Sequence, residues 1–313
     1  MKDKVIIITG PTASGKSDLA IKIAKKFNGE IISADSQQIY KKMNIGTNKI
    51  NKHDMDSINH YFLDIREPNE EYSVNEFKES ARKLIRKINK ENKIPIVVGG
   101  TGFYIDSILF NMNYGIAKKD ESIRKYYNKL AEEKGNNYIY EKLKEIDPNE
   151  SIKYHPNEKN RIIRALETYK LSGKKPSQIR KGSRKLNEDI DPLLIFLNYK
   201  DRNVLYKKIN ARVLKMFDEG LEDEFMRILK YYNLNRNSKS LQAIGYKEFF
   251  PYLSKEIDKN RLIDEIQKNT RHYAKRQITW MKKYLNYDFS DLIYKENLNI
   301  GKIYEYIKEK YDL

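Results

Sequence analysis

The sequence contains no cysteine among its 313 residues, so it can form neither disulfide bonds nor thiolate metal sites. Its four histidines show none of the spacings of zinc ligands, which argues against a zinc site. No run of about 18 apolar residues occurs, so we expect no transmembrane helix and no membrane partner. An apolar strand is expected directly after the first residues, so we expect no signal peptide. Together these absences predict a soluble, cytoplasmic protein.

The charge balance is strongly positive. Lys and Arg number 61 against 44 Asp and Glu, which gives a formal net charge of +17 at pH 7. Such an excess favours a polyanionic partner, because each Lys or Arg that contacts a phosphate releases a counterion. A lysine-rich surface that reflects a biased genome explains the charge equally well. Composition alone therefore leaves nucleic-acid binding open.

An apolar run at residues 5–9 leads into the sequence GPTASGKS at residues 10–17. This is the G-x-x-x-x-G-K-[ST] pattern, placed between an expected strand and an amphipathic helix. In that context the loop N–H groups and the helix N-terminus bind phosphate oxygens. Lys16 adds a full charge, and the Ser17 hydroxyl can take a Mg²⁺ position. The predicted phosphate site comprises Gly10, Pro11, Thr12, Ala13, Ser14, Gly15, Lys16 and Ser17.

Further apolar runs predict strands at residues 30–34, 60–65, 94–98 and 193–199. In open parallel sheets, ligands bind at the carboxyl ends of the strands. Asp35 follows one strand, and we interpret it as a general base or an outer-shell Mg²⁺ partner; a helix cap is the alternative. Thr101 follows another strand and is a plausible hydroxyl contact, with a plain turn as the alternative.

The expected fold is α/β: a P-loop NTPase-like parallel sheet flanked by helices, with an inserted all-helical subdomain and a helical C-terminal region. From about residue 113 the strands vanish, and Lys, Glu and Asn dominate. We therefore expect a catalytic core with C-terminal helices at residues 1–113 and 190–313, and a helical insertion at 114–189. Within the insertion, Arg161 and Arg164 share a helix face, where they could bind phosphate or pair with acidic neighbours.

A long helix is expected over residues 261–285. With about 100° per residue, one face is expected to pack and comprises Ile266, Tyr273 and Trp280. A nearly opposite, cationic face comprises Arg271, Lys275 and Lys282. Such a stripe suits an RNA backbone, and a solvated basic face is the alternative.

These motifs, in this order, resemble the tRNA dimethylallyltransferases. The resemblance rests on GPTASGKS at 10–17, DSQQIY at 35–40, GT at 46–47, GGTG at 99–102, HPN at 155–157, RIIRAL at 161–166, IGY at 244–246 and KRQITW at 275–280. It runs from about residue 5 to about 283. Without cysteine, the chain resembles the bacterial form rather than relatives with a C-terminal zinc finger. Lys41-Lys42 departs from a common Arg-Gly pair.

The resemblance implies transfer of a dimethylallyl group from dimethylallyl diphosphate to N6 of the adenosine at position 37, next to the anticodon, in tRNAs reading codons that start with U. The products are N6-(dimethylallyl)adenosine and diphosphate. The phosphate loop would hold the diphosphate with Mg²⁺ rather than a transferring ATP, and whether ATP also binds is left open. The expected partners are the tRNA anticodon stem-loop and dimethylallyl diphosphate, and we expect a monomer.

The resemblance also implies roles for individual residues. Asp35 would accept the N6 proton, while Lys16, Thr101 and Arg212 would surround the reacting groups. A carboxylate is adequate as the base, because the acidity of N6 rises as the nitrogen is alkylated. The expected tRNA contacts are Asp35, Ser36, Gln37, Gln38, Thr101, Arg124, Asn160, Arg161, Ile162, Ile163, Arg164, Lys275, Arg276, Gln277, Ile278, Thr279, Trp280, Met281 and Lys282.

Three other functions remain as alternatives. A phosphate-loop kinase of a small nucleoside or metabolite explains Lys16, Ser17 and Asp35 but not the basic C-terminal helix. A prenyltransferase acting on free AMP or ADP would not need a tRNA-sized basic surface. A non-catalytic RNA-binding regulator with a nucleotide switch would form no covalent product.

Overall fold

The computed structural model describes residues 2–113, 119–181 and 184–313. Its residues form two compact units, which we call the sheet unit, residues 1–109 and 188–313, and the helical unit, residues 110–187. The expected start of the insertion, residue 114, lies outside the described residues. No helix in the described ranges is both long and apolar enough to cross a membrane.

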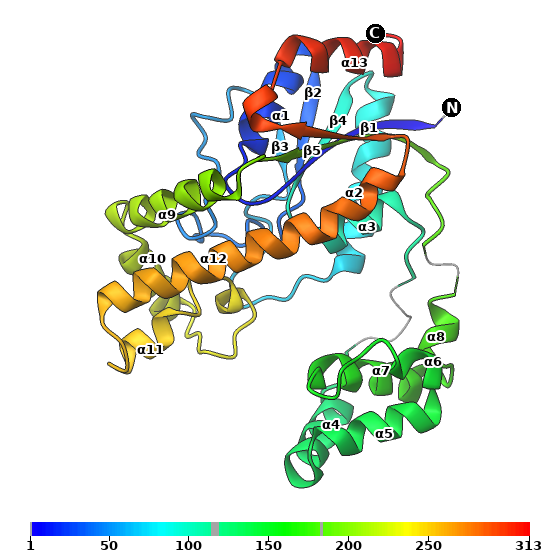
Figure 1. Ribbon diagram of the computed structural model, residues 1–313, viewed down its shortest axis with the longest axis vertical. Helices are drawn as coiled ribbons and strands as arrows, with labels where there is room; N and C mark the ends of the chain where they lie inside the picture. Colours follow the sequence, from blue (N-terminus) through cyan, green and yellow to red (C-terminus); the bar gives the residue numbers. More distant parts are fainter. Residues whose placement is uncertain (1, 114–118, 182–183) are drawn as a thin grey trace. The chain divides into compact units, whose positions relative to one another are not determined.

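The sheet unit is built on a parallel sheet with the strand order β3-β2-β4-β1-β5-β6 (Figure 1). The strands are β1 (Asp3–Thr9), β2 (Gly29–Ser33), β3 (His60–Tyr61), β4 (Ile94–Gly99), β5 (Ile190–Asn198) and β6 (Ser290–Tyr294). Residues Val5–Thr9 of β1 and all of β4 are buried, as expected for central strands covered on both faces. The α/β prediction is confirmed.

Helices cover both faces of this sheet. Apolar residues of α1 (Lys16–Lys26) and α13 (Ile300–Tyr311) form one core with alternate residues of the central strands, including Ile6 and Ile8. On the other face, α2 (Val74–Lys90) packs on β1 and β4, and α3 (Gly102–Leu109) packs on α2. The phosphate loop lies at the carboxyl end of β1, where the chain turns into α1.

Two expected elements differ from those observed. The strand predicted at residues 60–65 is only His60–Tyr61, because Phe62 and Asp64 adopt positive φ angles of 64° and 54° that end the extended conformation. The long C-terminal helix is α12 (Lys259–Met281), and residues Lys282–Asn286 continue as a 3₁₀ turn. It begins at Lys259 because the Asp258 side chain accepts a hydrogen bond from the Arg261 N–H.

The C-terminal helices of the sheet unit form a second core beside the sheet. They are α9 (Arg202–Asp218), α10 (Leu221–Tyr231), α11 (Phe249–Leu253) and α12. Their core is rich in aromatic rings, with Phe225 and Phe249 stacked and Tyr246 fully buried. Figure 1 shows α9 alongside α12, and these two helices pack against each other. At the cavity beside the phosphate loop, α9 contributes the cations Lys208 and Arg212, and α12 contributes Tyr273 and Gln277.

The helical unit has a core of its own. It contains α4 (Glu121–Lys134), α5 (Asn136–Ile146), α6 (Pro148–Ser151), α7 (Lys159–Ser172) and α8 (Pro176–Ile179). Ile139, Leu143, Ile162 and Leu166 are fully buried at its centre. Two carboxylates, Glu150 and Glu167, are also fully buried, and each pairs with arginine. These ion pairs offset the cost of burying the charges.

Candidate active site

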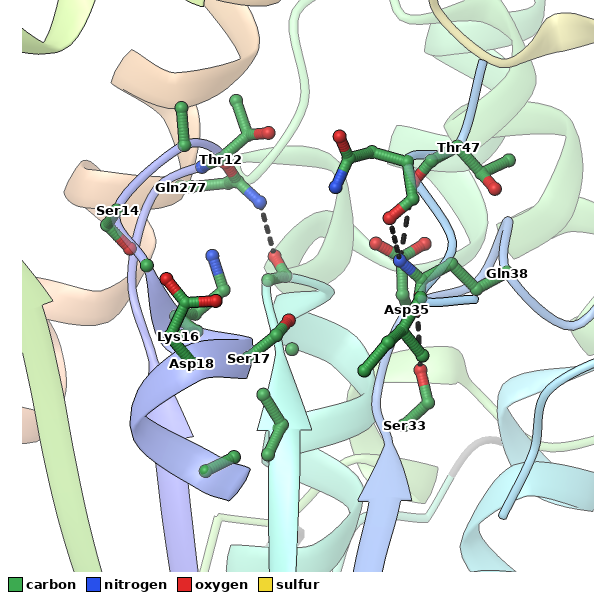
Figure 2. Close-up of a pocket in the computed structure, with 18 of the residues that line it drawn as sticks. Thr12, Ser14, Lys16, Ser17, Asp18, Ser33, Asp35, Gln38, Thr47 and Gln277 are labelled. Carbon is green, nitrogen blue, oxygen red and sulfur yellow. Dashed lines mark hydrogen bonds between the residues drawn. The ribbon is translucent and has the colours of Figure 1, made fainter. Parts of the chain in front are cut away.

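A cavity of about 380 Å³ lies in the sheet unit at the carboxyl ends of the strands. Figure 2 shows Lys16 and Ser17 of the phosphate loop on one side of it, with Asp35, Gln38 and Thr47 on the other. This is the position in which open parallel sheets bind ligands. The structure therefore brings the predicted phosphate site, Asp35 and Arg212 to one cavity.

The phosphate loop ends at Gly15, directly before the first residue of α1. Gly15 has φ +79° and caps the helix, a conformation that favours glycine. Lys16 Nζ donates a hydrogen bond to the Pro11 carbonyl at 2.7 Å. Burial, and secondarily the nearby Arg212, lower the pKa of Lys16 to about 8, while Asp35 opposes the shift. A bound anion would therefore stabilise the protonated form of Lys16.

Arg212, on α9, supplies a second, half-buried cation. Burial lowers the pKa of its guanidinium, and the Asp35 carboxylate acts in the opposite direction. Its Nε is buried and has no hydrogen-bond partner within the described part of the chain. A buried, unsatisfied charged donor is costly, so this group also favours an anionic ligand.

Asp35 and Thr101 come from the ends of two neighbouring strands. Asp35 Oδ1 accepts a hydrogen bond from the Gln37 N–H at 2.9 Å, so part of the capping alternative is observed. Thr101 Oγ1 accepts one from the Ser36 N–H at 3.1 Å. Asp35 also lines the cavity, which places its carboxylate beside any ligand bound there.

The basic stretch of α12 divides into two faces. Lys275, Arg276, Thr279 and Lys282 are exposed. Gln277 and Met281 point inward, and the Gln277 amide accepts from the Thr12 N–H at 2.8 Å and donates to the Gly100 carbonyl at 3.1 Å. Ile278 is half-buried beside Leu205, and the Trp280 ring packs edge-on against Phe103. Arg271 donates to Asn210, so it does not extend the exposed stripe.

In the helical unit, the expected tRNA-contacting arginines pair with acidic neighbours. Arg124 Nε and Nη2 donate to the two Glu167 carboxylate oxygens at 2.8 and 2.9 Å, and Arg164 Nη1 donates to Oε2 at 2.5 Å. Arg161 pairs with Glu158. Ile162 and Ile163 are buried in the core of the unit, whereas Asn160 is exposed. For Arg161 and Arg164, acidic pairing is one of the two alternatives that the sequence leaves open.

The cavity residues that were not predicted as site residues include three with ionisable side chains from the C-terminal helices and strand: Lys208, Tyr273 and Lys295. Tyr273 was placed on a packing face, but it lines the cavity, and the Thr101 and Gln277 side chains near its hydroxyl act to lower its pKa. Burial, and then the nearby Asp35, raise the pKa of this hydroxyl. Tyr273 precedes Gln277 by four residues and Lys208 precedes Arg212 by four, so helical spacing could have indicated both.

A buried carboxylate fixes another wall of the cavity. Glu224 accepts hydrogen bonds from the N–H groups of Asn44, Ile45 and Gly46, and from the Tyr246 hydroxyl at 2.7 Å. The next two residues, Thr47 and Asn48, line the cavity. Their carbonyls accept from the Gln38 amide at 3.3 Å each. Glu224 therefore fixes the conformation of the loop at residues 44–48.

The residues present fit a Mg²⁺ ion that is bound jointly with phosphate. Within the described ranges, no cluster of three or more His, Cys, Asp or Glu side chains could hold a metal by itself. Mg²⁺ usually takes only one or two protein ligands and completes its shell with phosphate and water. Ser17, Asp18 and Asp35 line the same cavity and offer oxygen ligands of that kind.

The chain is similar to known proteins over nearly its whole length. A family model described as IPP transferase matches residues 38–284. A tRNA dimethylallyltransferase of Caldanaerobacter subterraneus subsp. tengcongensis is 48% identical over 99% of this chain and 96% of that protein. The full-length tRNA isopentenylpyrophosphate transferase of Bacillus halodurans is 37% identical, with a TM-score of 0.72 over 99% of this chain and 97% of that one. A eukaryotic dimethylallyltransferase described as acting on tRNA is 32% identical, with a TM-score of 0.77 over 94% of this chain and 74% of that one.

Proposed function

The chain belongs to the IPP transferase family, and we propose that it transfers a dimethylallyl group from dimethylallyl diphosphate to N6 of the adenosine at position 37 of tRNA. Membership confirms the resemblance to tRNA dimethylallyltransferases, and the protein is a transferase. One observation carries the assignment of the reaction centre: two half-buried cations, Lys16 and Arg212, share a cavity with the Asp35 carboxylate.

The proposed reaction breaks the bond between the allylic C1 and the diphosphate oxygen and forms a bond between C1 and N6. The N–H groups of the phosphate loop, Lys16 and Arg212 stabilise the charge that develops on the departing diphosphate. Ser17 would hold Mg²⁺, which adds positive charge beside the same leaving group. Asp35 accepts the proton that N6 loses, so the diphosphate leaves with its electron pair and the amine ends neutral.

The basic surface supports a tRNA substrate over free AMP or ADP. Lys275, Arg276 and Lys282 are exposed on α12, whose inner face contacts the phosphate loop through Gln277. The net charge of +17 adds a general attraction for a polyanion. Extruding the adenine from its stack costs a few kcal/mol, which contacts along such a surface can offset. A phosphate-loop kinase is not favoured, because the relatives are tRNA prenyl transferases.

The finer parts of the proposal follow the resemblance. The substrates are tRNAs that read codons starting with U, recognised through the anticodon stem-loop. The enzyme acts as a monomer in the cytoplasm with Mg²⁺, and its phosphate loop holds diphosphate rather than a transferring ATP. Arg124, Asn160, Arg161 and Arg164 would contact tRNA from the helical unit.

The proposal is tested by incubating the protein with Mg²⁺, labelled dimethylallyl diphosphate and an unmodified tRNA that carries A37. We expect label in N6-(dimethylallyl)adenosine after nuclease digestion. The same tRNA with G37 is the matched substrate control and should remain unlabelled. Labelling of AMP or ADP instead of tRNA, or phosphorylation of a nucleoside from ATP, would contradict the proposed activity.

A further inference from the structure

The last strand of the sheet brings a lysine from outside the matched family range to the phosphate loop. β6 pairs in parallel with β5, and Tyr294 lies opposite Asn198 at the carboxyl ends of the two strands. Residue 295 therefore emerges at the same sheet edge as the phosphate loop. The family model ends at residue 284, so this segment lies beyond it.

Lys295 lines the cavity, and its ammonium group lies beside Gly15 of the phosphate loop. A methyl group placed on Gly15 would come within 2.9 Å of Lys295 Nζ and 3.4 Å of its Cε. Gly15 caps the N-terminus of α1, which carries partial positive charge. A cation at that position is repelled by the helix, so the arrangement favours an anion between them.

The lysine has no anionic partner of its own. Among the described residues, no ion pair involves Lys295, and the Asp18 carboxylate nearby makes none either. The lysines elsewhere on the surface often do pair with a carboxylate, as Lys283 does with Asp106 at 2.7 Å. Within the described ranges, Lys295 is therefore a cavity-lining cation that forms no ion pair, although the Asp18 carboxylate lies near the same point of the phosphate loop.

The turn that carries Lys295 is fixed by its neighbours. The Glu296 carboxylate accepts from the Lys200 N–H at 3.2 and 3.3 Å. The preceding residue, Tyr199, donates from its hydroxyl to the Ala13 carbonyl of the phosphate loop at 3.4 Å. These bonds link the β5 end, the β6 end and the phosphate loop, so the lysine is held beside the loop before any ligand arrives.

We propose that Lys295 is a further diphosphate-binding residue, whose ammonium donates to a terminal oxygen of the bound dimethylallyl diphosphate and of the diphosphate product. Together with Lys16 and Arg212 it encloses the diphosphate with cations from three separate elements. This assignment rests on the proposed function and deepens it. It assigns to the C-terminal segment a role in donor binding and none in tRNA binding.

The test compares Lys295→Ala with Lys302→Ala, which removes the same charge from an exposed position on α13. We measure the KM for dimethylallyl diphosphate, the KM for tRNA, and the Kd of inorganic diphosphate with Mg²⁺ by calorimetry. Loss of one charge-assisted hydrogen bond should raise the KM for dimethylallyl diphosphate and the Kd of inorganic diphosphate about tenfold. The KM for tRNA should stay within about twofold, Lys302→Ala should match the wild type, and Lys295→Arg should recover most of the affinity.

The outcomes separate the two proposals. Equal diphosphate Kd values for Lys295→Ala and Lys302→Ala would overturn the role of Lys295. An equal rise in both KM values, without recovery in Lys295→Arg, would indicate a structural role and would overturn it as well. If the wild type fails to modify tRNA but Lys295→Ala still weakens diphosphate binding, the proposed function fails while the diphosphate site stands.

Discussion

Replacing Glu224 by Gln should destabilise the protein and its active site together. The carboxylate is 4% exposed and its two oxygens accept from three backbone N–H groups and the Tyr246 hydroxyl. Burial, and then Glu224 itself, raise the pKa of Tyr246, so that hydroxyl stays protonated and donates. Glutamine has the same shape but replaces one acceptor oxygen by an NH₂ group. If Oε2 is replaced, the Asn44 N–H loses its acceptor; if Oε1 is replaced, the Gly46 N–H and the Tyr246 hydroxyl do, since the Ile45 N–H reaches both oxygens. In either case the new NH₂ group adds buried donors without partners.

The magnitude follows from counting those donors. Each buried donor left unsatisfied costs about 1–3 kcal/mol, so with two such donors Glu224→Gln should lower the free energy of unfolding by about 2–6 kcal/mol. At about 2–4 °C per kcal/mol for a unit of this size, the melting temperature should fall by at least about 4 °C. The loop that Glu224 holds carries Thr47 and Asn48 to the cavity, so kcat/KM for tRNA prenylation should fall as well.

The matched control is Glu222→Gln on the same helix. The Glu222 carboxylate accepts from the Tyr252 hydroxyl at 3.0 Å and pairs with Lys259 at 3.0 Å, both near the surface. Pairs of this kind contribute about 0–1 kcal/mol, so the control should melt close to the wild type. Thermal unfolding monitored by circular dichroism measures both variants. Melting temperatures within about 2 °C of each other would refute the reasoning about buried donors.

Three other perturbations test the site. Asp35→Asn should lower single-turnover prenylation at least about 10²-fold while leaving tRNA affinity in filter binding nearly unchanged, and retained turnover would remove Asp35 from the role of base. Because the pKa of Lys16 is lowered to about 8, the affinity for inorganic diphosphate should fall as pH rises above 8, when the lysine loses its proton. Lys16→Met should be weaker throughout and lack this fall, and an unchanged profile would exclude Lys16 as its cause. Glu167→Gln should weaken tRNA binding, because it removes the carboxylate that orients Arg124 and Arg164. Glu158→Gln, which releases only Arg161, should weaken it less. A binding titration in which Glu158→Gln has the larger effect would contradict this prediction.

Local pattern was enough to predict the features that depend on neighbouring residues in the chain. The strand before Gly10, the loop itself and Asp35 after its strand were all predictable, because parallel strands place their carboxyl ends at one sheet edge. The strand predicted at residues 60–65 failed because Phe62 and Asp64 adopt positive φ, which apolar alternation does not reveal. Glu224 could not be found, since its partners at residues 44–46 lie about 180 positions away along the chain.

The stretch at residues 275–282 shows why a contiguous motif need not have a single role. At about 100° per residue, adjacent residues of α12 face in different directions. Lys275 and Arg276 are exposed. The Gln277 amide instead accepts a hydrogen bond from the Thr12 N–H of the phosphate loop and donates one to the Gly100 carbonyl. A methyl group on Gly100 would lie within 2.0 Å of the Gln277 amide nitrogen, so the small residues after β4 are required by this helix as well as by any ligand. The inner face of α12 therefore sets the geometry of the phosphate loop, and its outer face is left for the polyanion that the net charge attracts.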